Sequence, residues 1–142
     1  MAATLLVGID GSECAERAAD LAVKYAELVG AKVHLLAVIE WSRYGFYTPE
    51  ELETRARDRK EEEARANEVL QPLKDRLANG VDVTTSVEFG HPAKVLREVA
   101  REANVSQIFI GRHGRSRFET AIFGSVTNKI LQFAPVPVTV VP

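Results

Sequence analysis

Short apolar segments alternate along this chain with longer amphipathic ones, and this alternation predicts an α/β fold. Five segments have the length and composition of strands, and four helical segments lie between them. No hairpin signal joins two of the strands. Strands separated by helices pair in parallel through right-handed crossovers, so we expect a parallel sheet with helices on both faces. The 142 residues, 46% of them hydrophobic, are enough for one domain covering residues 1–142.

The first strand, helix and second strand are predicted within the first forty residues. Residues 4–9 form an apolar run with β-branched members, which is typical of a buried strand. Ser12 is expected to cap a helix whose apolar residues recur at helical spacing until Gly30 ends it. Residues 32–39 repeat the buried-strand pattern, and an aromatic-rich loop, residues 41–47, follows them.

A long helix is predicted next. Thr48 and Glu51 have the spacing of a capping box, with Pro49 at the first helical position. The first half of the helix is almost entirely charged, so we expect it to project into solvent. Pro72 removes a backbone donor, and we expect a kink or a break there. The second half carries an apolar stripe made of Ala66, Val69, Leu70, Leu73 and Leu77.

The remaining elements complete the sheet. Residues 81–89 alternate between apolar and polar, which indicates an edge strand. A helix over residues 92–103 and a short buried strand over residues 107–110 follow. The last helix is expected over residues 125–133 and the closing strand over residues 137–141. We expect an open, Rossmann-like sheet with strand order 3-2-1-4-5 and ligands beyond its carboxyl edge.

Composition and charge exclude several classes of function. The chain has 18 Lys and Arg against 20 Asp and Glu, a net charge of -2, so nucleic acid is not expected as a partner. No stretch approaches the ~20 apolar residues that span a bilayer, and no secretory signal is seen, so we expect a cytoplasmic protein that is not membrane-embedded. Cys14 is the single cysteine, which excludes an internal disulfide. The histidines lack metal-ligand spacing, so we expect no structural metal.

Two glycine turns that flank one loop indicate an anion-binding site. Gly111 follows a buried strand, Gly114 comes three residues later, and Gly124 and Ser125 open the last helix. Glycine lets the backbone approach phosphate oxygens closely, and a helix N-terminus offers unpaired N–H donors. The hydroxyl groups of Ser125 and Thr127 are further candidate donors.

The same loop is rich in cations. Arg112, Arg115 and Arg117 can each bind phosphate through two parallel hydrogen bonds. The residues alone leave a second interpretation open, in which the glycines serve only turn and cap geometry and the arginines are solvated. His113 lies on the same loop, where an exposed histidine is more often solvent-facing than a general base, so we assign no catalytic residue.

The glycine string and three longer segments together resemble one known family. Gly111, two residues, Gly114, nine residues and then Gly124-Ser125 match the pattern of ATP-binding members of the universal stress protein family. Residues 6–12 resemble the opening strand and turn of that family, residues 33–40 its second strand and residues 135–141 its closing strand. The resemblance therefore covers nearly the whole chain.

The resemblance implies a role for individual residues. Asp10 matches an acidic position that contacts the ribose or the adenine side, and Gly8 lies two residues before it. The main chain of Val38 matches the position that reads the adenine edge. Ribose and phosphate contacts are implied for Gly111, Gly114, Gly124, Ser125, Val126 and Thr127, to which we add Arg112 and Arg115 as candidate phosphate ligands.

Three of these positions keep alternatives. Asp10 precedes Gly-Ser, so its side chain could simply bond nearby N–H groups as a turn former. Gly8 stands where many family members have Pro or Ala. Arg112 stands where a small residue is common, and it could add a phosphate contact or narrow the pocket.

The resemblance implies a regulatory protein of the stress response that binds ATP and signals the occupancy of its site to a protein partner. AMP and ADP are alternative ligands, and Mg²⁺ can accompany the bound ATP. It also implies a homodimer formed through the closing strand. The chain lacks G-x-G-x-x-G after its first strand and lacks G-x-x-x-x-G-K-[ST], which disfavours dinucleotide and P-loop enzymes. Two alternatives stay open: slow ATP hydrolysis or nucleotidyl transfer with Asp10 holding a metal, and a nucleotide-independent dimeric interaction module.

Overall fold

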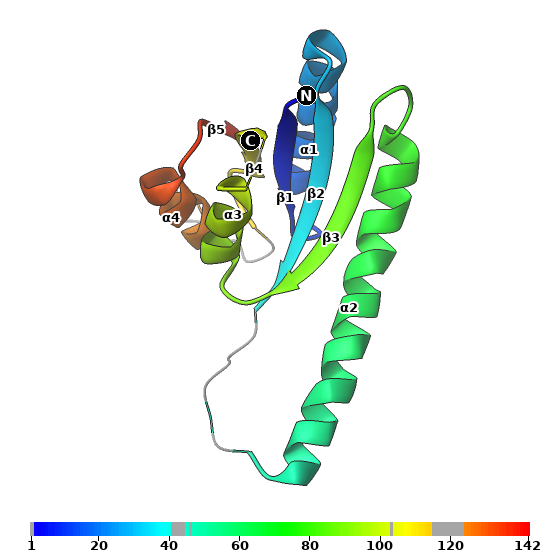
Figure 1. Cartoon of the computed structure of the whole chain (residues 1–142), viewed down its shortest axis with the longest axis vertical. Coiled ribbons are helices and arrows are strands. Elements are labelled where there is room, and N and C mark those ends of the chain that lie inside the picture. The colour runs from blue at the N-terminus through cyan, green and yellow to red at the C-terminus, as the bar shows by residue number, and fades with distance from the viewer. Residues whose placement is uncertain (1, 41–44, 46, 103, 115–123) are drawn as a thin grey trace.

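The computed structural model describes residues 2–40, 45, 47–102, 104–114 and 124–142. Its five strands form one parallel sheet in the order β3-β2-β1-β4-β5, which confirms the predicted fold class and strand order (Figure 1). The elements are β1 (Thr4–Ile9), α1 (Glu13–Val29), β2 (Lys32–Ile39), α2 (Pro49–Leu77), β3 (Val83–Phe89), α3 (Pro92–Ala100), β4 (Val105–Gly111), α4 (Ser125–Phe133) and β5 (Val138–Val141).

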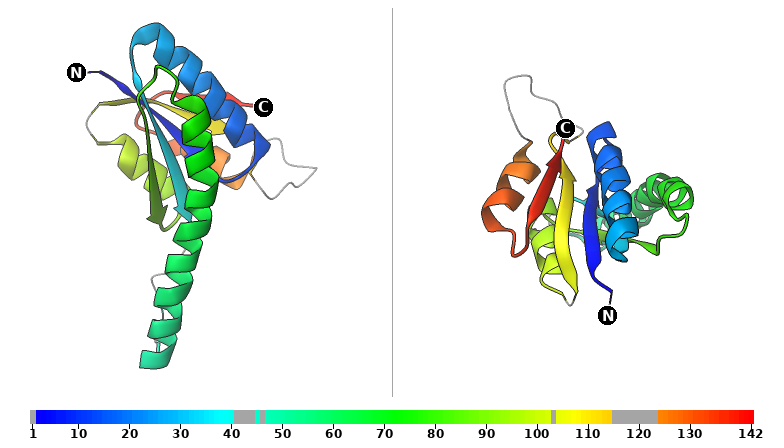
Figure 2. Two further views of the ribbon diagram at one scale, coloured as in Figure 1. Left: turned by 90° about the vertical axis from the view of Figure 1, so that its right-hand side faces the viewer. Right: turned by 90° about the horizontal axis from the view of Figure 1, so that it is seen from above.

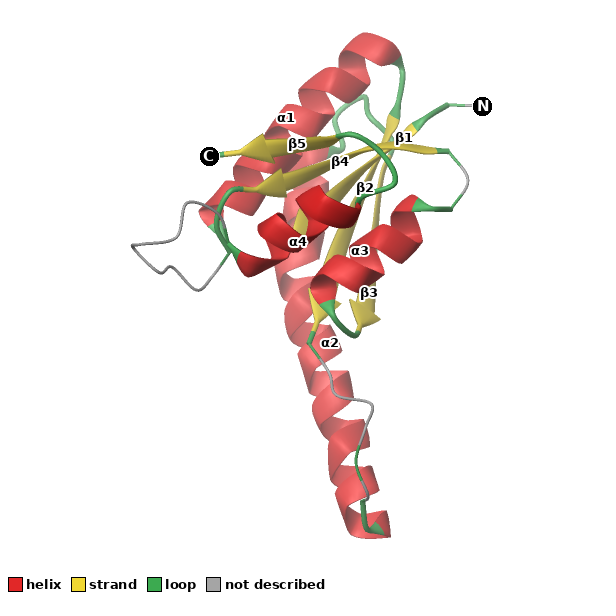
Figure 3. Cartoon of the chain, turned by 90° about the vertical axis from the view of Figure 1, so that its left-hand side faces the viewer, coloured by secondary structure: helices red, strands yellow, loops and turns green. Residues whose placement is uncertain are grey.

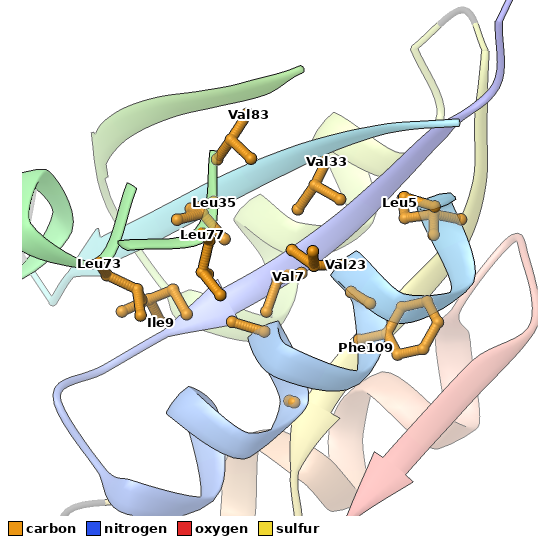
Figure 4. Close-up of a cluster of buried hydrophobic side chains, with 14 of the residues drawn as sticks. Leu5, Val7, Ile9, Val23, Val33, Leu35, Leu73, Leu77, Val83 and Phe109 are labelled. Atoms are coloured by element: carbon orange, nitrogen blue, oxygen red, sulfur yellow. The ribbon is translucent and has the colours of Figure 1, made fainter. Parts of the chain in front are cut away.

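Helices cover both faces of the sheet, and each face has its own apolar core. The helices α1 and α2 lie on one side, and α3 and α4 lie together on the other (Figures 2 and 3). In β1, Leu5 and Val7 point into the core under α1 and α2, whereas Leu6 belongs to the core under α3 and α4. Figure 4 shows the first of these cores, including Phe109 from β4. Since both faces are buried, the inner strands have nearly continuous apolar sequences.

The ends of α1 and the start of α2 are set by local sequence as predicted. The Ser12 hydroxyl accepts a hydrogen bond from the Ala15 amide at 3.2 Å, and Gly30 ends α1 with φ 72°. Thr48 and Glu51 form the reciprocal capping box at the start of α2. These side chains satisfy backbone groups that a helix leaves unpaired at its ends.

The long helix α2 runs for 29 residues without interruption, so of the kink or break expected at Pro72 the break is wrong. Pro72 is exposed, while its neighbours Leu70, Leu73 and Leu77 are buried against the sheet. Burial of three leucine side chains contributes about 1.5–3 kcal/mol each, which offsets the one backbone hydrogen bond that proline removes. The N-terminal half of α2 extends beyond the end of the sheet, as its charge predicted (Figure 1).

The remaining boundaries differ slightly from the expectations. β3 lies at one edge, as predicted, but begins at Val83 rather than at residue 81. α3 ends at Ala100, and the expected helical residue Ala103 lies outside the described residues. Asn104 has φ 71°, a conformation that breaks a helix, and it leads directly into β4. β4 is longer than expected because it pairs with β1 from Val105 and with β5 as far as Gly111.

Candidate functional site

A cavity of about 860 Å³ opens at the carboxyl end of the sheet. From β1 the chain crosses to β2 on one side, while β4 lies on the other side, so the strand order reverses between β1 and β4. Open α/β sheets bind ligands beyond the strand ends at such a reversal. The cavity is lined by these residues from the sequence prediction: Gly8, Asp10, Val38, Gly111, Gly114, Gly124, Ser125, Val126 and Thr127.

The ends of β1 and β4 and the start of α4 meet so closely in the cavity that two of the glycines leave little room for a side chain. A Cβ atom built on Gly114 would lie 2.9 Å from Oδ2 of Asp10. A Cβ atom on Gly124 would lie 3.3 Å from the Gly114 amide nitrogen. The Gly124 amide also donates a hydrogen bond of 2.9 Å to the Arg112 carbonyl, which ties the two glycine turns together.

Asp10 has the turn-forming role considered for it and also lines the cavity. Its Oδ1 atom accepts a hydrogen bond of 2.9 Å from the Ser12 amide, so the turn-forming role is present. Its Oδ2 atom faces Gly114, and the residue lines the cavity. The turn thus orients the carboxylate toward the space between β1 and the glycine loop.

Packing alone requires glycine at position 111. A Cβ atom there would lie 2.6 Å from Cβ of Cys14 and 3.0 Å from the Ala15 amide nitrogen, in the first turn of α1. The Gly111 carbonyl accepts a hydrogen bond of 2.8 Å from the hydroxyl of Thr127, which is only 4% exposed. The Thr127 hydroxyl, proposed from the sequence as a phosphate donor, therefore joins α4 to the end of β4.

The N-terminus of α4 points at the cavity. Gly124 is its N-cap with extended backbone angles, φ −66° and ψ 161°. The first amides of a helix have no partner inside the helix, and the aligned peptide dipoles place a partial positive charge there. The amides of Ser125, Val126 and Thr127 are the first of α4, so this end of the cavity suits an anion.

Part of the cavity lining is apolar. Leu36, Leu96 and Ile110 are buried beneath it, and Val38 lies at its edge near the end of β2. A Cβ atom on Gly8 would lie 3.5 Å from both Leu96 and Ile110, an ordinary contact distance. These side chains can cover one face of a flat ring, while backbone groups remain to read its edge.

Sequence reasoning missed one wall of the cavity. Asp58, Glu62 and Arg65 of α2 line it, although this half of the helix was expected only to project into solvent. The helical spacing contained the signal, since Glu62 lies four residues before Ala66 and hence on the face of the apolar stripe.

Of the arginines in the glycine loop, the structure describes only Arg112. Arg112 does not line the cavity among the described residues, and its amide donates a hydrogen bond of 2.7 Å to the Val141 carbonyl of β5. Arg115 lies outside the described residues, as do Arg117 and most of the aromatic loop. Within the described ranges, no three His, Cys, Asp or Glu residues form a group that could hold a metal ion. No helix in those ranges has the length and apolarity needed to cross a membrane.

The fold and the cavity define an open α/β protein with a ligand site where its strand order reverses. A model of the universal stress protein family matches residues 1–142, and the chain belongs to this family. A putative universal stress protein of Staphylococcus aureus strain USA300 is 34% identical over 140 residues, which cover 96% of this chain and 82% of the relative.

Solved structures show the same fold. The universal stress protein UspA from Lactobacillus plantarum matches with a TM-score of 0.87 at 23% identity, covering 99% of this chain and 97% of its own. A universal stress protein in complex with cAMP matches with a TM-score of 0.71 at 22% identity, covering 99% of this chain and 97% of the other. The universal stress protein from Archaeoglobus fulgidus in complex with dAMP matches with a TM-score of 0.61 at 20% identity, covering 100% of this chain and 98% of the other.

Proposed function

We propose that residues 1–142 form an adenine-nucleotide-binding domain, that ATP is its ligand, and that occupancy of the site regulates a protein partner in the stress response. The observation that carries this proposal is the meeting of Asp10, Gly114 and Gly124 in front of the α4 N-terminus. Glycine backbone and helix amides suit phosphate, and the apolar part of the cavity lining suits a base. The nucleotides in two related structures support adenine as that base.

In this proposal the phosphates lie along Gly111, Gly114 and Gly124 at the start of α4, and the adenine lies beside Val38. Asp10 stands between these regions, where its carboxylate can accept a hydrogen bond from a ribose hydroxyl. Mg²⁺ prefers oxygen ligands and keeps several waters, so one carboxylate together with phosphate oxygens suffices for an ion bound with ATP. Arg112 and Arg115 remain proposed phosphate ligands.

The test starts with the nucleotide carried by the purified protein. Extraction followed by mass spectrometry identifies it, and calorimetric titration with ATP, ADP and AMP, with and without Mg²⁺, ranks the ligands. Gly124→Val should abolish binding because the added side chain fills the approach to Gly114. Ala78→Val, at an exposed position at the end of α2, serves as the control. A wild-type protein that binds none of the three nucleotides would contradict the proposal.

The same titrations can follow turnover. We expect ATP to be cleaved no faster than in buffer, although His113 and several carboxylates line the cavity with Asp10, because a phosphoryl-transfer site also has to hold metal ions and orient the attacking water. If the wild type hydrolyses ATP, and Asp10→Ala removes this activity while ATP affinity is retained, the protein is instead a slow ATP hydrolase.

We also propose that the chain forms a homodimer through β5, which lies at one edge of the sheet (Figure 3). The outer side of an edge strand offers backbone N–H and C=O groups with which another strand can pair. Leu131 and Phe133 of the preceding helix α4 are 43% and 59% exposed. Sedimentation equilibrium at micromolar concentration should give the mass of a dimer. A monomer would favour a different role for this edge. The cytoplasmic location stays a prediction.

A further inference from the structure

The side of the cavity formed by α2 is charged, and the proposed nucleotide contacts do not use it. Asp58, Glu62 and Arg65 lie at positions i, i+4 and i+7 of the helix and so share one face. Further along, this face carries Leu70 and Leu73, which are buried against the sheet. The sheet-facing side of α2 therefore changes from apolar to charged where the helix passes the strand ends.

The net charge of this side is negative. Glu40, at the end of β2, lines the cavity together with Asp58 and Glu62, so three carboxylates oppose one guanidinium. That guanidinium, on Arg65, lies 3.1 Å from Glu62 and 3.7 Å from Glu61, so its positive charge is shared between two carboxylates.

The strand order determines which part of a nucleotide faces this wall. The strands β4, β1 and β2 are neighbours in that order, so Gly111 at the end of β4 and Val38 on β2 lie on the two sides of β1. The helix α2 lies beyond β2, on the opposite side of the molecule from α4 (Figures 1 and 2). A nucleotide whose phosphates lie at α4 therefore directs its sugar and base toward α2. Carboxylates there can accept hydrogen bonds from hydroxyl or amino groups and repel any further negative charge.

We propose that Asp58 and Glu62 are specificity-determining residues that select adenine nucleotides with uncharged sugar hydroxyls and exclude those with a second phosphate on the sugar. The proposal rests on the nucleotide binding proposed above and adds a reason for the charged face of α2. The two carboxylates act by like-charge repulsion across the cavity, and Arg65 holds Glu62 in place through their ion pair.

The experiment compares AMP with adenosine 3′,5′-bisphosphate and adenosine 2′,5′-bisphosphate by calorimetry at low salt. The wild type should bind AMP about tenfold more tightly than either bisphosphate, the scale expected for two repelling charges at partly solvated contact. In the Asp58→Asn, Glu62→Gln double variant this ratio should fall to about twofold, and the remaining preference comes from the Asp10 carboxylate, which also lines the cavity. Glu63→Gln removes an exposed carboxylate from the same helix outside the cavity and should leave the tenfold ratio intact.

Salt supplies a second readout. Since the Debye length falls from about 10 Å at 0.1 M to about 3 Å at 1 M, the ratio in the wild type should shrink as salt rises, and the ratio in the double variant should shrink less. An unchanged ratio in a double variant with a native circular dichroism spectrum would overturn the proposal, as would equal wild-type affinity for AMP and both bisphosphates. Failure of the wild type to bind AMP or ATP would instead remove the proposed function on which this inference rests.

Discussion

The carboxylate of Asp10 and the backbone of Gly114 lie so close together that a Cβ atom at position 114 would lie 2.9 Å from Oδ2 of Asp10. The two residues are far apart in sequence and meet only because β1 and β4 are neighbours in the sheet. Any side chain at position 114 must displace the carboxylate, and Oδ1 of that carboxylate also accepts the Ser12 amide.

We therefore expect Gly114→Ala to weaken ATP binding at least about tenfold, or about 1.4 kcal/mol, with the fold retained. Calorimetry gives the affinity, and thermal unfolding followed by circular dichroism gives the stability. In the wild type, Gly114→Ala should lower the free energy of unfolding because it displaces the Asp10 carboxylate. In the Asp10→Ala variant it should not, since that carboxylate is absent. Equal stability loss in both backgrounds would show that Asp10 is not the group displaced.

Gly111 and Gly8 both line the cavity, yet they should respond differently to alanine. Gly111→Ala places a Cβ atom 2.9 Å from the carbonyl carbon of Cys14 and 3.0 Å from the Ala15 amide nitrogen, and backbone atoms cannot easily move aside. We expect a loss of about 1–3 kcal/mol in the free energy of unfolding. Gly8→Ala meets only ordinary contacts at 3.5 Å and should change stability little. Denaturant titration of both variants checks this, and similar stabilities would contradict the packing argument.

We expect loss of the buried Thr127 hydroxyl to lower the free energy of unfolding more than it lowers ligand affinity. Thr127→Val keeps the shape but leaves the Gly111 carbonyl without its hydroxyl donor, at a cost of about 1–3 kcal/mol. Thr127→Ser keeps the donor and should lose less. Unfolding titrations of the ligand-free protein make the comparison. If valine leaves stability unchanged and lowers only ATP affinity, the hydroxyl contacts phosphate directly.

His34 gives the fold a predictable pH dependence. Its ring nitrogens lie 2.6 Å from the Thr84 hydroxyl and 2.7 Å from the Ser86 hydroxyl, both on β3. Burial lowers its pKa below 6.5, and this effect outweighs the opposite influence of Glu102 and Glu88. The unfolded chain thus binds a proton more readily than the folded one below pH 6.5.

The stability contributed by neutral His34 is therefore fully present above pH 6.5 and is lost as the pH falls through that value toward the lowered pKa of the folded state. The melting temperature should fall between pH 7.5 and pH 5.5. His34→Gln should reduce that fall, whereas His91→Gln, at an exposed position, should preserve it. An identical pH profile for His34→Gln would rule out His34 as the titrating group.

Most of the fold could be predicted from the sequence because its signals are local. Burial on both faces makes β1 and β2 continuously apolar, and caps such as Ser12 and Thr48 act within three residues of themselves. The break expected at Pro72 was wrong because the buried leucines around it belong to a tertiary contact that the local rule does not include.

For the candidate site, the sequence by itself determined the glycine spacing from Gly111 to Gly124 and the placement of Asp10 and Val38 at strand ends, since strand ends and turns follow from short-range pattern. Only the tertiary structure decided that Gly111 packs on Cys14 and that the charged face of α2 walls the cavity. Those relationships depend on how helices cross the sheet, and crossing positions are decided by packing between segments that are far apart along the chain.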